Sequence, residues 1–148
     1  MKIRKKLKKR LLHTTAFCSV LMFSMFSGAS TASAAPPGFA GPFNAACKGT
    51  RMPDVSLGIW DAKLQIWRDQ AAQTICAKVV DNAAGPRLMG VQLGRTDWAT
   101  SFTDEGIYDD YAGVIYVSKA SMGPNEWVRI IGWVVVNGSL YRGSASYS

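Results

Sequence analysis

Histidine is almost absent from this chain of 148 residues, and the single copy, His13, lies in an N-terminal segment that we expect to be removed on export. A product without histidine excludes histidine-activated nucleophiles, as in Ser-His-Asp and Cys-His sites, and zinc sites with histidine ligands. The sequence also contains no phosphate-cradling glycine loop, no Cys-x-x-Cys pair and no nucleophile elbow. From these motifs we assign no catalytic residue, no cofactor and no metal site.

Acidic residues are absent from the first 35 positions, whereas seven of the 17 Lys and Arg residues fall within residues 1–10. An apolar stretch follows, and small residues then lead to Ala32-Ser33-Ala34. A positive start, an apolar centre and an A-x-A site are typical of a secretory signal peptide. We expect residues 1–34 to be cleaved off, which leaves a secreted, extracellular protein. A retained membrane anchor is the weaker alternative because the apolar part is short for a span, so we expect no membrane span in the mature form.

Loss of this segment removes the positive charge of the chain. The formal net charge of +7 falls to about zero, because ten basic groups then face ten acidic ones. Binding to phosphate backbones needs a basic surface, so we expect no nucleic-acid partner.

Cysteine is scarce, and only Cys47 and Cys76 remain after the signal peptide. An exported chain meets an oxidising environment, so we expect a disulfide between them that closes a loop of about 30 residues. Two free buried thiols are the alternative.

No segment shows a sustained helical period. Residues 35–46 are rich in Pro and Gly and predict an irregular lead-in, whereas residues 47–148 contain short apolar runs separated by turn residues. This spacing predicts a single all-β domain, a small antiparallel sandwich or barrel. Residues 127–136 are apolar on both faces and predict a central strand, and Asn137-Gly138 predicts a type I′ hairpin after it.

Residues 103–113 hold four of the ten acidic residues. We expect a solvated acidic loop between two strands. Calcium binding is an alternative, although the spacing is not that of an EF-hand. A pair of carboxylates that cleaves glycosides is another, and it would require a defined separation that the sequence does not reveal.

Aromatic residues are abundant, and all five tryptophans lie beyond residue 34. Trp67 falls on the strand face opposite Leu64 and Ile66, which predicts an exposed ring. Trp67, Trp127 and Trp133 are therefore candidate ligand-binding residues that would stack on sugar rings or anchor a partner. Burial of these rings in the core of a sandwich is the competing interpretation, and it is the one that a strand with two apolar faces favours.

The segment Asp104-Glu-Gly-Ile-Tyr-Asp-Asp-Tyr-Ala-Gly-Val-Ile-Tyr-Val117 resembles one found in the spore-associated protein A family of small secreted actinomycete proteins. The family pattern is Asp-x-Gly-x-aromatic-x-x-Tyr-Ala-Gly-Pro-Val-x-Val. Val114 departs from it by replacing the proline, and nothing after Val117 matches. The matching positions here are Asp104, Gly106, Tyr108, Tyr111, Ala112, Gly113, Tyr116 and Val117.

This resemblance implies a secreted protein that is found with the spore or cell exterior, and it supplies no catalytic residues. We therefore expect a non-enzymatic protein whose partner is a spore or cell-surface component, with a polysaccharide among the candidates. An extracellular carbohydrate-binding module or a proteinaceous inhibitor that presents exposed aromatics is the alternative, and a small hydrolase is a third.

Overall fold

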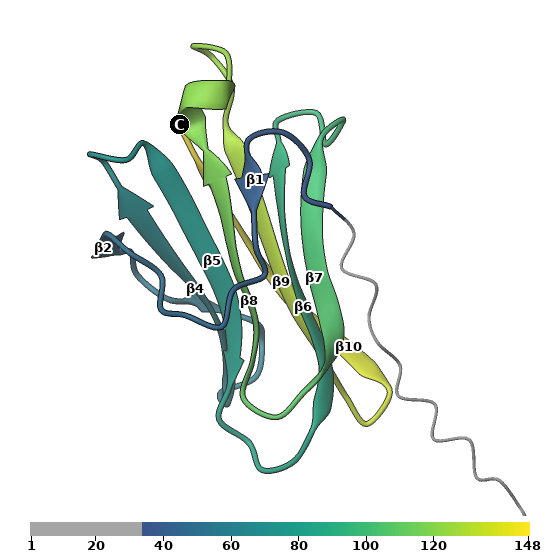
Figure 1. The fold of residues 1–148 in the computed structure, drawn as a ribbon. Helices are drawn as coiled ribbons and strands as arrows, with labels where there is room; N and C mark the ends of the chain where they lie inside the picture. The colour runs from purple at the N-terminus through teal and green to yellow at the C-terminus, as the bar shows by residue number, and fades with distance from the viewer. Residues whose placement is uncertain (1–33) are drawn as a thin grey trace, which may run out of the picture. The chain divides into compact units, whose positions relative to one another are not determined.

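The computed structural model describes residues 34–148, which fold as an antiparallel β-sandwich (Figure 1). The predicted all-β class is confirmed, and the architecture is the sandwich. The predicted signal peptide lies almost entirely outside the described residues. One sheet, here called sheet A, has the order β1-β8-β5-β4-β2, with β3 also paired to β4, and the other, sheet B, has the order β10-β9-β6-β7. The strands are β1 Phe39–Ala40, β2 Thr50–Arg51, β3 Val55–Ser56, β4 Ala62–Asp69, β5 Thr74–Asp81, β6 Arg87–Arg95, β7 Ser101–Tyr108, β8 Tyr111–Ser118, β9 Val128–Val136 and β10 Ser139–Tyr147.

The core lies between the two sheets and is built by alternation along each strand. Leu64 and Ile66 of β4 are fully buried, while the residues between them face outward. The sheets approach closely at Gly132 of β9, where a Cβ atom would lie 2.6 Å from a methyl group of Val79 on β5. This position therefore has no room for a side chain. Each β-branched or leucine side chain buried in this core contributes about 1.5–3 kcal/mol by the usual area estimate.

Strand β9 and its hairpin follow the sequence prediction. The strand lies between β10 and β6, and both of its faces are covered or half-covered. Asn137 and Gly138 then have φ angles of 51° and 78°. Two consecutive positive φ angles are the requirement of a type I′ turn, so this prediction is confirmed.

The lead-in is mostly irregular, but it contributes strand β1, which pairs with β8. It then crosses sheet A and is tied to β5 by a disulfide between Cys47 and Cys76, whose Cα atoms are 5.8 Å apart. The predicted disulfide is confirmed. Tyr116 of β8 adds a second attachment, because its hydroxyl accepts a hydrogen bond from the backbone N–H of Lys48 at 3.3 Å.

The prediction of an acidic loop over 103–110 is wrong for most of its length. Residues up to Tyr108 belong to β7, and β8 begins at Tyr111, so only Asp109 and Asp110 form the turn. In β7 the side chain of Asp104 points inward and that of Glu105 points outward, because strand residues alternate. No helix among residues 34–148 is long and apolar enough to cross a membrane.

Candidate functional site

The three candidate tryptophans lie on different parts of the sandwich. Trp67 is half-buried on the outside of sheet A, and the charged groups of Arg51 and Lys78 each lie 5.6 Å from its ring. Trp127 is 48 % exposed and precedes β9. Trp133 lies in β9 and faces outward from sheet B. The structure therefore does not unite them in one site, and the ring of Trp67 is already shared by two cations.

The outer face of sheet B presents regular rows of side chains. Register places its outward side chains in rows across four strands, and consecutive rows are about 6.6 Å apart because every second residue faces outward. One row is aliphatic and largely exposed, with Ile107 at 72 % and Leu140 at 60 %. The next row contains Trp133. The outward side-chain positions are 88, 90, 92 and 94 on β6, 101, 103, 105 and 107 on β7, 129, 131, 133 and 135 on β9, and 140, 142, 144 and 146 on β10.

Trp133 is held in place by two features of its row. Its indole covers Gly90 of β6, where a Cβ atom would lie 2.5 Å from Cε2 of the ring, so a side chain at position 90 would displace it. The indole Nε1–H donates a hydrogen bond to Oε2 of Glu105 at 3.0 Å. One side of the ring is thus against the sheet and one edge is fixed, which leaves the ring oriented along the surface of the sheet.

A second tryptophan repeats this arrangement two rows away. Trp98, in the loop between β6 and β7, covers Gly94, where a Cβ atom would lie 2.5 Å from Cζ3 of its ring. The guanidinium of Arg129 lies 5.3 Å from the centre of the same ring, and its Nη1 donates to the carbonyl of Thr96 at 3.3 Å. Trp98 therefore packs against an arginine, whereas no cation of residues 34–148 lies over the Trp133 ring.

Two hollows lie side by side on this face. The first, of about 500 Å³, surrounds the free side of Trp133. The second, of about 400 Å³, lies between Trp98 and strands β9 and β10. Arg142 and Ile131 line both of them, so the two hollows form one surface. Its principal residues are Leu88, Glu105, Trp133 and Leu140 at one end, Ile131 and Arg142 in the middle, and Trp98, Arg129, Ser144 and Ser146 at the other end.

The residues of the family motif form a separate, connected cluster. The carboxylate of Asp104, which is 8 % exposed, accepts hydrogen bonds from the Tyr108 hydroxyl at 2.7 Å and from the backbone N–H of Gly113 at 2.6 Å. Gly106 leaves room for the Tyr108 ring, since a Cβ atom there would lie 3.0 Å from it. Burial, and then the bond to Asp104, raise the pKa of Tyr108 well above its usual value.

This cluster joins the two sheets, because Asp104 belongs to β7 of sheet B and Gly113 to β8 of sheet A. Tyr111 extends it toward the lead-in by donating a hydrogen bond to the side chain of Asn44 at 2.9 Å, and Ala112 is buried in the core. A hollow of about 420 Å³ lies beside it, lined by Asp109 and Asp110. Among residues 34–148 no group of three or more His, Cys, Asp or Glu side chains is arranged to hold a metal ion.

Sequence reasoning missed Trp98 and the tryptophan rings that cover the two glycines. The signal was the repeat of glycine at positions 90 and 94 of one strand, since a glycine within a strand often marks a close approach by another group. It also missed Trp60, which is 89 % exposed in the loop before β4. No family model, no curated protein and no solved structure matches this chain.

Proposed function

We propose that this protein is a secreted, non-enzymatic β-sandwich that is retained at a spore or cell surface by binding polysaccharide on the outer face of sheet B. The observation that carries the proposal is the position of Trp133. A ring that lies along the surface of a sheet, with one side open, suits stacking against the apolar face of a sugar ring. Sugar hydroxyls would find hydrogen-bond partners in the polar side chains of the same face.

Three further features support export and the absence of catalysis. The disulfide is typical of proteins in an oxidising compartment. No histidine occurs among the described residues. The buried carboxylate Asp104 is engaged by two protein donors, which suits a structural role in the motif better than an acid–base role. From the motif of residues 104–117 we also propose distant kinship with the spore-associated protein A family. In this chain Asp104 and Gly113 of the motif join the two sheets through a hydrogen bond.

A retention experiment tests this function. Residues 35–148, which include all ten strands, would be mixed with isolated spores, vegetative cell walls and insoluble polysaccharides and then washed in buffer of moderate ionic strength. Trp133→Ala should lower the retained fraction about tenfold, as expected for loss of a central aromatic anchor. Trp67→Ala removes the same side chain from sheet A and should leave retention unchanged. Equal retention of both variants, or release of the wild-type protein from every material, would refute the proposal.

A further inference from the structure

The outer face of sheet B carries an excess of positive charge. Its four strands present two cations, Arg129 and Arg142, and one anion, Glu105. Among residues 34–148 neither arginine has a carboxylate within salt-bridge distance, since the ion pairs involve Arg51, Lys63 and Arg87 instead. The two guanidinium groups are therefore available to an anionic ligand.

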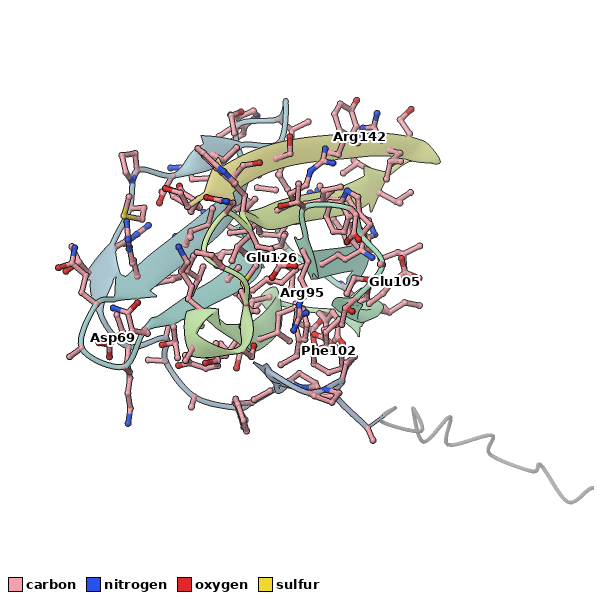
Figure 2. The ribbon with its side chains drawn as sticks, turned by 90° about the horizontal axis from the view of Figure 1, so that it is seen from above. Asp69, Arg95, Phe102, Glu105, Glu126 and Arg142 are labelled. Carbon is pink, nitrogen blue, oxygen red and sulfur yellow. A yellow bond between two sulfur atoms is a disulfide. The ribbon has the colours of Figure 1, made fainter. Side chains whose placement is uncertain are left out.

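The charges are also separated across the sheet. Arg142 lies on β10 at one edge and Glu105 on β7 at the other, with β9 and β6 between them (Figure 2). Strands are about 4.8 Å apart, which puts these two backbone positions about 14 Å from each other. The carboxylate of Glu105 accepts the hydrogen bond of the Trp133 indole, and Glu105 and Arg142 line the same hollow beside that ring. The half of the face over β9 and β10 is thus purely cationic.

Each arginine lies next to a tryptophan. Arg142 is the direct cross-strand partner of Trp133, and both side chains line the hollow at the free side of the ring. Arg129 is held over Trp98 and by the carbonyl of Thr96. The two lie four residues apart along antiparallel partners, about 13 Å, and the hydroxyls of Ser144 and Ser146 flank them.

We propose that the ligand of this face is an acidic polysaccharide built from uronic acid units, with Arg142 and Arg129 binding carboxylates of one chain while Trp133 stacks on a sugar ring. This inference rests on the proposed function and names its substrate class. A planar guanidinium matches a carboxylate with two parallel hydrogen bonds. In a polyuronate every unit offers both a ring face and a carboxylate, which is the combination that Trp133 and Arg142 present side by side. A phosphodiester-linked polyol offers the charge without a ring in its backbone, and so fits the tryptophan less well.

The decisive comparison uses the unmodified protein and three polymers. Polygalacturonate carries rings and carboxylates, its methyl ester keeps the rings without the charge, and poly(glycerol phosphate) keeps charge without the rings. Binding would be measured by quenching of tryptophan fluorescence at several salt concentrations. An exposed ion pair contributes up to about 1 kcal/mol, a factor of about five, so two of them should give polygalacturonate up to about 25-fold tighter binding than its ester. That advantage should shrink as salt is raised.

Two double variants test whether Arg129 and Arg142 cause the preference for polygalacturonate. Arg129→Gln with Arg142→Gln should abolish the preference for polygalacturonate while leaving binding to the ester in place. Lys48→Gln with Arg68→Gln removes the same charge from the sheet A side and should leave the preference unchanged.

The outcomes separate this inference from the function on which it rests. Equal binding of acid and ester, or tighter binding of poly(glycerol phosphate), overturns the uronate inference and leaves polysaccharide binding standing. Failure to bind the polymers and every material of the retention experiment overturns both. The polymer comparison uses only the wild-type protein, so its result does not depend on whether any variant folds.

Discussion

Replacing Asp104 with asparagine should destabilise the fold without touching the sheet B surface. The carboxylate accepts two hydrogen bonds, from the Tyr108 hydroxyl and the Gly113 backbone N–H, and is almost fully buried. In Asp104→Asn the amide oxygen would accept from Gly113, and the amide nitrogen would face the hydroxyl of Tyr108, which can turn to accept from it.

Asp104→Asn loses the negative charge that strengthens both hydrogen bonds. A hydrogen bond to a charged group contributes about 1.5–3 kcal/mol, against about 1 kcal/mol for a bond between neutral groups. Part of this difference is returned because an amide costs less to bury than a carboxylate, so the free energy of unfolding should fall by about 1–2 kcal/mol. Asp104→Ala leaves both donors without a partner and should lower the free energy of unfolding by about 3–4 kcal/mol.

Urea denaturation of residues 35–148 measures these changes. With a denaturant slope of about 2 kcal/mol/M, the midpoint should fall by roughly 0.5–1 M in Asp104→Asn and by more in Asp104→Ala. Asp110→Asn is the matched control, because Asp110 is exposed in the turn and its side chain has no hydrogen-bond partner in the described residues. Its free energy of unfolding should stay within about 0.5 kcal/mol of the wild-type value. Equal and small effects of the two asparagine variants would refute the structural role of Asp104.

Three further predictions concern other parts of the sandwich. Since the folded state holds Tyr108 protonated while the unfolded chain loses this proton near pH 10, the free energy of unfolding should fall as pH rises above about 10, and Tyr108→Phe should weaken that fall in urea titrations. Cys47→Ser opens the loop to Cys76 and should lower the free energy of unfolding by about 3–4 kcal/mol; two free thiols in the native protein would contradict the disulfide. Gly90→Ala forces the Trp133 indole off its strand and should weaken polysaccharide retention as Trp133→Ala does, whereas Gly123→Ala, which has room for a methyl group, should not.

Much of the fold could be predicted from local patterns. Alternation around Leu64 and Ile66 places one face of β4 in the core, and Asn137-Gly138 specifies the hairpin because few residues accept two positive φ angles in succession. The disulfide followed from the count, since only two cysteines lie beyond the expected signal peptide.

The acidic segment was predicted to be a loop because its four carboxylates were given more weight than the strand-like alternation of its residues. Four carboxylates in eight residues suggest solvent, yet β7 alternates Phe102, Asp104 and Gly106 inward with Thr103 and Glu105 outward. A buried carboxylate becomes favourable only when donors from another strand meet it, and no local pattern shows that Gly113 does so.

The candidate site also depends on contacts between distant segments. Trp133 is oriented by Gly90 and Glu105, which reach it only through the register of β9 on β6 and of β6 on β7. The tryptophan and the strand glycines are visible in the sequence, but which ring covers which glycine, and which carboxylate bonds the edge of the ring, are not. The same holds for Trp98, whose position on Gly94 depends on the path of a loop.

The central claim, that the outer face of sheet B is the binding surface, is tested most directly by the indole N–H signals of the five tryptophans in a nitrogen-15 NMR spectrum. Each signal would be assigned by a single Trp→Phe variant and followed while an oligogalacturonide is added. We expect the Trp133 signal to shift most, the Trp98 signal to shift through the hollow that Trp98 lines, and the signals of Trp60 and Trp67 to stay in place. Shifts confined to Trp60 or Trp67, with Trp133 unchanged, would show that the ligand binds elsewhere than on sheet B.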